Sequence, residues 1–245
     1  MERPLPIASR RTTSPSVTPQ EPTKRIRTTG GLVVAVYRAR ADVGVTTVAT
    51  SLARAFRSLG SEQVALVELD ARAVRARSAS PTGDIPAAVA DAERFDIPSL
   101  NAALVRQSDG VWTLGMTRPR TPAMGDAKSV TVALDATRAR FPVSIVEVEH
   151  QVNERTLAAF DAADRIVIVT EGSVPTLRGT QRVLRLCRRL NYPDEKMCVV
   201  VNRSDAPGSL AAADIAVALK REVFWKIGSA DAFDLAGLAE RLLAD

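Results

Sequence analysis

The feature that most constrains this chain is a repeated alternation between short apolar runs and longer segments with apolar residues at helical spacing. Leu32–Tyr37, Arg165–Val169 and Met197–Val201 are runs of the first kind. Continuous apolar runs of this length are typical of strands buried on both faces of a parallel sheet. The segment Thr46–Leu59 has helical spacing and is closed by Gly60, a residue that commonly follows a helix.

The same alternation continues to the end of the chain. Further strands are expected at Val64–Val67, Val111–Met116, Val143–Val148 and Val223–Ile227, and further helices at Ile97–Gln107, Ala127–Arg140, Glu154–Phe160, Thr176–Leu190, Leu210–Leu219 and Phe233–Leu243. Strands that alternate with helices predict an α/β fold, here a single doubly wound, mostly parallel sheet with helices on both faces. This domain is expected to span residues 31–245, with Ala71–Asp96 as a long loop.

The first 30 residues differ in composition from the rest. They are rich in Pro, Ser, Thr and Arg and show no apolar period, which is typical of a disordered tail. Between positions 2 and 30 six basic side chains stand against two acidic ones, so this tail carries about +4 of the net charge of +5. The basic pI therefore gives little support to nucleic-acid binding by the folded part.

Composition excludes several other classes of protein. The chain has 46% apolar and 25% charged residues, as globular proteins do. No apolar run is long enough for a transmembrane helix or a signal peptide. The two cysteines, Cys187 and Cys198, are too few for a disulfide framework and lack metal-site spacing. A cytoplasmic protein is expected.

The segment that joins the first strand to the first helix, Arg38–Thr47, carries the main candidate site. In a parallel sheet, ligands bind beyond the carboxyl ends of the strands. A phosphate-binding loop at such a place needs small residues, a helix N-terminus, a lysine for the phosphates and a Ser or Thr for Mg²⁺. Gly44, Thr46 and Thr47 satisfy part of this requirement.

These residues resemble a known family. Arg40–Thr47 is similar to the deviant Walker A loop, Lys-Gly-Gly-Val-Gly-Lys-Thr-Thr, of the P-loop ATPases of the MinD/ParA family. Glu68-Leu69-Asp70 resembles the family's Asp-x-Asp, and Ile145-Val146-Glu147 resembles its switch II strand. Asn202 stands where the family has an adenine-contacting asparagine. The stretch Asp164–Asn202 looks most like the TadZ/CpaE-like pilus-assembly branch.

The resemblance implies roles for individual residues. The implied nucleotide-binding positions are Arg40, Gly44, Thr46, Thr47, Asp70 and Asn202; Thr46 is also the implied Mg²⁺ ligand, and Glu68 and Glu147 take the catalytic positions. The implied cofactors are ATP or ADP with Mg²⁺. Arg40 matches the lysine that reaches across the family's dimer to the partner's nucleotide, and arginine keeps that charge.

Two of the departures from the family pattern weigh against phosphate binding. Val45 replaces the loop lysine, and Asp42 places a carboxylate where an anion should bind. Three interpretations remain open: a loop that is inert to nucleotide, a site that binds nucleotide with little hydrolysis, and an active ATPase. The first two make the chain a pseudo-ATPase, expected to act as a homodimeric localisation or assembly factor for a pilus or secretion machine, recruited to the membrane or a cell pole. The third implies an ATPase in partitioning or cell-division positioning.

Two further hypotheses concern other ligands. Asn202-Arg203-Ser204-Asp205 is similar to the Asn-Lys-x-Asp sequence that reads guanine in GTPases, which makes GTP an alternative to ATP. The arginines of the helix that spans 178–189 are typical of a solvated face, with DNA or an acidic partner as the alternative.

Overall fold

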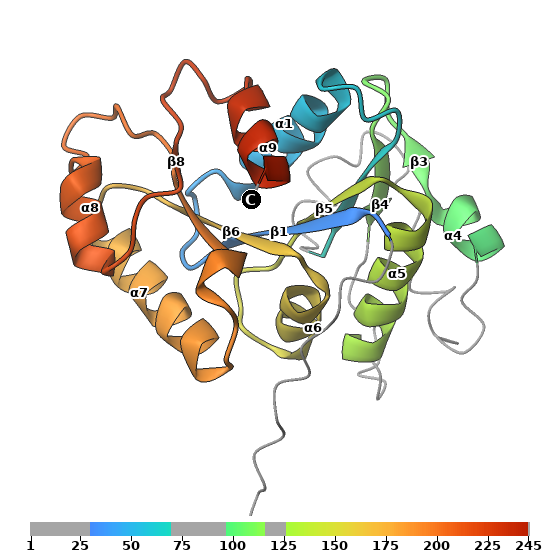
Figure 1. The fold of residues 1–245 in the computed structure, drawn as a ribbon, viewed down its shortest axis with the longest axis horizontal. Coiled ribbons are helices and arrows are strands. Elements are labelled where there is room, and N and C mark those ends of the chain that lie inside the picture. Colours follow the sequence, from blue (N-terminus) through green and yellow to red (C-terminus); the bar gives the residue numbers. More distant parts are fainter. Residues whose placement is uncertain (1–29, 70–96, 116–125, 245) are drawn as a thin grey trace, which may run out of the picture.

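A computed structural model describes residues 30–69, 97–115 and 126–244 of the chain (Figure 1). Its strands are β1 (Leu32–Arg38), β2 (Val64–Glu68), β3 (Val105–Arg106), β4 (Trp112–Gly115), β5 (Val143–Glu147), β6 (Arg165–Thr170), β7 (Met197–Val201) and β8 (Trp225–Lys226). Its helices are α1 (Val45–Ser58), α4 (Ile97–Ala103), α5 (Asp126–Arg140), α6 (Glu154–Ala162), α7 (Val174–Arg189), α8 (Ala212–Leu219) and α9 (Ala236–Ala244), with a 3₁₀ turn, η1, at Asp194–Lys196. Residues 1–29 of the expected tail and the expected loop at Ala71–Asp96 lie outside the described residues.

The strands form one eight-stranded sheet in the order β3-β4-β2-β5-β1-β6-β7-β8. Every neighbouring pair is parallel except β3 and β4. The predicted mostly parallel sheet is therefore confirmed, and the carboxyl ends of its parallel strands share one edge.

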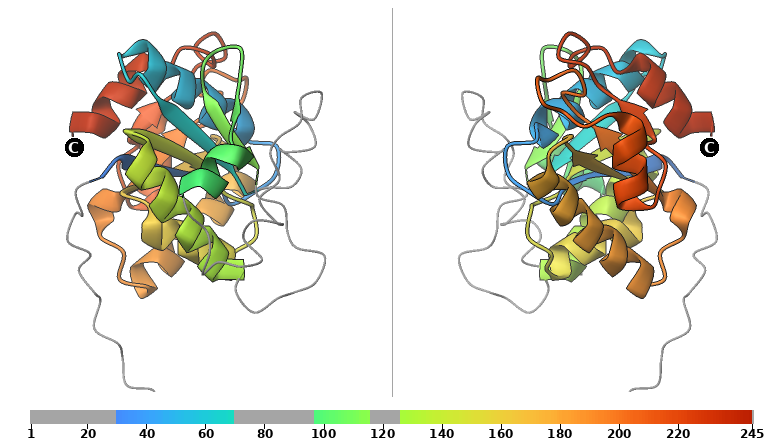
Figure 2. Two further views of the ribbon diagram at one scale, coloured as in Figure 1. Left: turned by 90° about the vertical axis from the view of Figure 1, so that its right-hand side faces the viewer. Right: turned by 90° about the vertical axis from the view of Figure 1, so that its left-hand side faces the viewer.

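Helices cover both faces of this sheet because its central strands are apolar on both sides. In β1, Val33 and Ala35 belong to one apolar core, and Val34 and Val36 belong to the other. Figures 1 and 2 show α1 and α9 on one face and α5, α6 and α7 on the other. The doubly wound arrangement follows from the burial of both faces.

At the edge of the sheet, the structure differs from one prediction made from the sequence. A helix was expected to continue through Gln107, but α4 ends at Ala103, and β3 forms an antiparallel hairpin with β4. The turn is closed by bonds from Gln107 N–H to the Val111 carbonyl and from Gly110 N–H to the Gln107 carbonyl. Gly110 has a φ of 82°, so the Asp-Gly pair before Val111 supplies the left-handed residue of the turn between β3 and β4.

The last strand is also shorter than expected. β8 covers only Trp225 and Lys226, although Val223–Ile227 was predicted. Backbone bonds from Phe224 N–H to Val199 and from Ile227 N–H to Val201 continue the association with β7 on both sides of this short strand. The predicted element is therefore present at the sheet edge with reduced regular pairing.

Arg138 forms hydrogen bonds with residues next to the amino-terminal end of β1. Its guanidinium donates to the Gly31 carbonyl at 2.9 Å, to Asp164 Oδ2 at 2.9 Å and to the Ala162 carbonyl at 2.6 Å. Asp164 Oδ2 also accepts from the N–H of Val33 at 2.8 Å. One guanidinium thus joins α5, β1 and the start of β6.

Replacement of Arg138 by alanine should lower the free energy of unfolding by about 2–4 kcal/mol, because three bonds of a largely buried cation are lost together. Urea unfolding followed by circular dichroism measures the change. Arg54→Ala is the matched control, since the Arg54 side chain is 50% exposed in its ion pair with Asp109 and should cost less than about 1 kcal/mol. Equal costs for the two variants would contradict the prediction.

Candidate functional site

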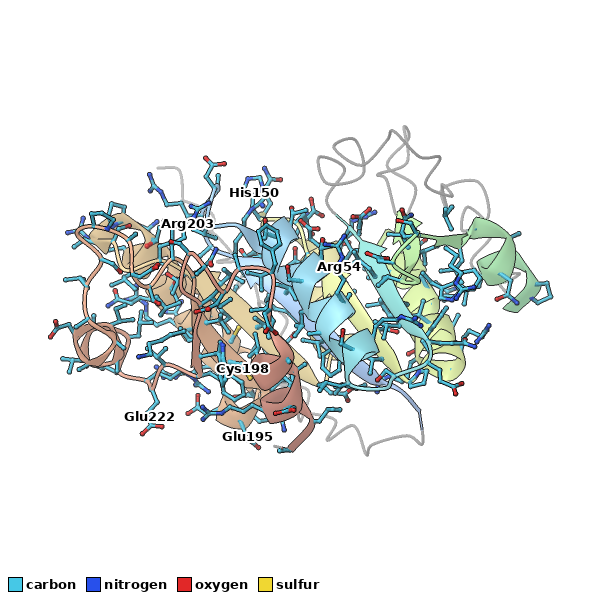
Figure 3. All side chains as sticks on the ribbon, turned by 90° about the horizontal axis from the view of Figure 1, so that it is seen from above. Arg54, His150, Glu195, Cys198, Arg203 and Glu222 are labelled. Carbon is cyan, nitrogen blue, oxygen red and sulfur yellow. The ribbon has the colours of Figure 1, made fainter. Side chains whose placement is uncertain are left out.

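The candidate site lies at the carboxyl-terminal edge of the parallel strands. Figure 3 shows Arg203, which follows β7, and His150, which follows β5, at one edge of the molecule, and Glu195 and Glu222, which precede β7 and β8, at the opposite edge. Because the central strands are parallel, the carboxyl ends of β1, β2, β5, β6, β7 and β8 lie on one side. Ligands of open α/β sheets bind at this side.

The loop from Arg38 to Val45 changes direction through two left-handed residues. Asp42 has a φ of 66° and Gly44 a φ of 80°. A Cβ atom at Gly44 would lie 2.6 Å from Asn202 Nδ2, so this position requires glycine for both space and conformation. Arg40, Ala41 and Asp42 are exposed at the tip of the loop.

Two side chains from the loop after β7 hold this segment in place. Asn202 Nδ2 donates to the Val43 carbonyl at 2.9 Å. Arg203 Nη1 donates to the Asp42 carbonyl at 3.0 Å and to Glu171 Oε1 at 2.6 Å. Consecutive carbonyls of the first loop are therefore bound by consecutive residues of the second.

Helix α1 begins directly after Gly44. The first hydrogen bond within the helix runs from the Val48 N–H to the Gly44 carbonyl. The N–H groups of Val45, Thr46 and Thr47 come before this bond in the chain and therefore have no acceptor within the helix. No side chain caps this helix and its first turn holds no acidic residue. Exposed N–H groups at a helix N-terminus favour an anion.

Val45, the first residue of α1, points into the apolar core. Its side chain is 1% exposed and belongs to the same cluster as Val43 and Val48. The side chain at this position therefore adds no positive charge to the edge where an anion would bind.

Glu68 and Glu147 lie side by side at the ends of β2 and β5. The register pairs them directly, and both side chains are fully buried. Thr46 Oγ1 donates to Glu147 Oε1 at 2.5 Å. Two carboxylates and a hydroxyl are hard oxygen donors of the kind that Mg²⁺ prefers, so these three residues fit such an ion in chemical type. Among the described residues, no group of three or more His, Cys, Asp and Glu side chains is placed to bind a metal.

Arg155 is a buried cation at this edge that the sequence analysis did not single out. Its side chain is 3% exposed and lies 3.5 Å from Glu149 Oε1, which also accepts from Asn153 Nδ2 at 3.0 Å. Its Nη2 donates to the Leu69 carbonyl at a long 3.4 Å. An arginine in an amphipathic helix is ordinarily exposed, so the pattern around it carried no signal for this role.

Tyr37 links the end of β1 to the loop after β5. Its hydroxyl donates to the His150 carbonyl at 2.9 Å, and burial raises the pKa of Tyr37 to about 12. The hydroxyl therefore keeps its proton at neutral pH and remains a donor. His150 lies in the segment that follows β5.

The structure brings together most of the residues singled out from the sequence. Gly44 contacts Asn202, and Thr46 contacts Glu147, which lies beside Glu68. Thr47 is half-buried and Arg40 is exposed; the part of the chain that the structure describes offers neither side chain a hydrogen bond. Asp70 lies outside the described residues.

Solved structures with a similar fold include ParA-type and MinD-type proteins. A ParA family ATPase from Chlorobium tepidum superposes with a TM-score of 0.67 at 17% identity and covers 87% of this chain and 88% of its own. MinD from Pyrococcus horikoshii in complex with Mg-ADP gives 0.67 at 12%, covering 86% and 94%. The MinC:MinD complex of Aquifex aeolicus gives 0.64 at 18%, covering 88% and 96%.

Neither protein-family models nor curated proteins match the chain. The protein therefore has the α/β fold of the MinD/ParA-type ATPases, whose members in these structures act in cell division and plasmid partition. None of its described helices is long and apolar enough to span a membrane.

Thr46→Val should destabilise the protein by about 1–3 kcal/mol, because Glu147, which is fully buried, loses a hydroxyl donor. Thr47→Val is the matched control and should stay within about 0.5 kcal/mol. Both values come from chemical denaturation in the absence of nucleotide. A Thr46→Val protein as stable as the control would show that the Thr46–Glu147 bond contributes nothing to folding.

Proposed function

We propose that this chain is a pseudo-ATPase with the MinD/ParA fold, and that it serves as a dimeric assembly or localisation factor for a pilus or secretion machine. The burial of Val45 carries this proposal. The side chain at the start of α1 packs into the apolar core at the position where the family motif has the phosphate-binding lysine. In phosphoryl transfer, a cation stabilises the negative charge that develops on the phosphate in the transition state. Removal of such a cation lowers the rate of hydrolysis by orders of magnitude.

The charge of the loop supports the same conclusion. Asp42 is exposed at the tip of the loop, in the left-handed conformation that the family motif assigns to glycine. A carboxylate near the helix N-terminus opposes the approach of a phosphate. The loop thus combines the loss of one positive charge with the gain of one negative charge.

The contacts of the loop with the rest of the protein also favour a scaffold. Asn202 and Arg203 hold the carbonyls of Val43 and Asp42 through protein contacts alone. A loop that is fixed in this way keeps its conformation with no phosphate to organise it. The surface around it can then present a constant shape to a partner protein.

The expected partner surface lies at the tip of this loop. Arg40 is exposed, and its match to the lysine that crosses the family's dimer supports a homodimer contact through this side chain. The resemblance of Asp164–Asn202 to the pilus-assembly branch supports the choice of machine. The structural neighbour from Aquifex aeolicus binds a second protein, MinC, and we propose by analogy that this chain works through protein contacts in the cytoplasm, recruited to the membrane or a cell pole.

An active ATPase of the partitioning or cell-division type is the second candidate. The observation in its favour is the polar cluster of Thr46, Glu147 and Glu68, which can supply a Mg²⁺ ligand and two carboxylates. ATP or ADP with Mg²⁺ would be the cofactor of this alternative. In that case Arg40, the exposed arginine at the tip of the loop, would have to replace the missing lysine.

Hydrolysis of ATP and GTP by the purified full chain with Mg²⁺ should not exceed the buffer background, because buried Val45 supplies no cation at the start of α1. Released phosphate is the readout, and Thr46→Ala is the control variant. Hydrolysis that requires Mg²⁺ and disappears in Thr46→Ala would establish the ATPase alternative instead.

Arg40→Glu should weaken the dimer by at least about tenfold, since the substitution reverses a charge at the contact. Sedimentation equilibrium measures the dimer, and pilus number on host cells that carry the variant should fall in parallel. Arg182→Glu, an equally exposed substitution on α7, is the control. A monomeric wild type, or a host that keeps all its pili without the protein, would overturn the proposal.

A further inference from the structure

The loop after β7 holds a third polar side chain that the proposed function does not use. Asn202 and Arg203 bind the loop before α1, and Asp205 lies two residues further on. Asp205 is exposed, yet its position is defined: Oδ1 accepts from the N–H of Ser229 at 2.8 Å and from Ser229 Oγ at 2.9 Å. Ser229 belongs to the loop after β8, so this contact joins the last two loops of the site edge.

The two bonds from Ser229 fix both the orientation and the charge of this carboxylate. They lower the pKa of Asp205 below its ordinary value, so the group is ionised at neutral pH. Both bonds fall on Oδ1, and the described residues provide no ion pair to either oxygen. A Cβ atom at Gly228 would lie 2.9 Å from Asp231 Oδ2 and 3.5 Å from Asp205 Oδ2, so a second carboxylate borders the free oxygen of Asp205 and strengthens its preference for a hydrogen-bond donor.

A buried acceptor of the same loop points independently to a ligand. Asn202 is 5% exposed, and its Oδ1 has no hydrogen-bond partner among the described residues. Its Nδ2 binds the Val43 carbonyl and lies 2.6 Å from the position of a Cβ atom at Gly44. A buried acceptor without a donor costs about 1–3 kcal/mol, which a donor on a ligand would recover.

The chemistry of the carboxylate selects among nucleobases. An ionised carboxylate only accepts hydrogen bonds. Guanine offers two adjacent donors, N1–H and the C2 amino group, and Oδ2, which Ser229 leaves available, can accept from them, whereas adenine offers an unprotonated N1 that repels it. A hydrogen bond to an ionised carboxylate is stronger than one between neutral groups.

The order of the strands places the start of α1 and the loop that holds Asp205 two strands apart on the same side of the sheet. Anions are favoured at the N-terminus of α1, which follows β1, while β7 and β8 lie beyond β6 on one side of β1. The bonds of Asn202 and Arg203 to the loop before α1 bring the two regions together. A nucleotide lying along this edge would have its base over the loops that follow β7 and β8.

We propose that this edge binds a guanine nucleotide and that Asp205, oriented by Ser229, reads the base. The specificity differs from the adenine preference that the family resemblance implies. This inference goes beyond the proposed assembly role. The binding of a guanine nucleotide can be measured separately from ATP hydrolysis, dimer formation and pilus number. With Val45 and Asp42 at the phosphate end, the ligand is a bound structural element that is not turned over.

Titration calorimetry of the full chain with GDP, ADP and xanthosine diphosphate, each with Mg²⁺, tests the proposal. GDP should bind on the order of tenfold more tightly than ADP, a modest ratio because Asp205 is exposed to solvent. Equal binding of GDP and ADP, tighter binding of ADP, or no binding of GDP at about 1 mM would each overturn the proposal, whatever the result of the hydrolysis and pilus assays.

Substitution of the carboxylate should change the preference in a defined way. Xanthine has a carbonyl oxygen in place of the C2 amino group of guanine, so the amide of Asp205→Asn can donate to it. This variant should lose affinity for GDP and gain affinity for xanthosine diphosphate, while Asp214→Asn, an exposed aspartate of α8, should bind as wild type does. Ser229→Ala should reduce the GDP preference without raising xanthosine diphosphate affinity. An Asp205→Asn protein that keeps the wild-type order of ligands would exclude Asp205 as the base-reading residue.

Discussion

The candidate site depends on one interaction, the hydrogen bond from the side-chain amide of Asn202 to the carbonyl of Val43. This bond connects the loop before α1 to the end of β7, although β6 lies between β1 and β7 in the sheet. The neighbouring Arg203 adds a second bond to the same loop and an ion pair with Glu171 after β6. Three loops are therefore fixed relative to one another by two adjacent side chains.

The start of α1 and the loops after β7 and β8 lie at the same edge of the sheet but differ in polarity and charge. At the start of α1 the side chain of Val45 is apolar and buried, and the exposed charge of Asp42 is negative. After β7 and β8 the polar groups are retained, with Asp205 oriented by Ser229. Catalysis of phosphoryl transfer requires charge stabilisation at the phosphates, whereas recognition of a base requires directed hydrogen bonds. Our proposals follow from this difference: the edge has groups for the second requirement and lacks a cation at Val45 for the first.

The alternation of strands and helices could be predicted from the sequence because each buried strand reads as a continuous apolar run. The edge hairpin of β3 and β4 could not, because β3 has only two residues and both lie within Ile97–Gln107, a segment with the pattern of a helix. Arg155 was missed for another reason. Its burial results from contacts with Glu149 and Leu69, and Leu69 lies on a different part of the chain.

The sequence by itself determined the α/β class, the loop at the carboxyl end of the first strand and the residue types available there, since these depend on local apolar patterns and on neighbouring residues. The tertiary structure decided which of those residues meet. Asn202 and Val43 are 159 positions apart, and Glu68 faces Glu147 only because β2 pairs with β5 in one register. Strand order and register depend on the packing of the whole sheet, and no local pattern of residues contains that information.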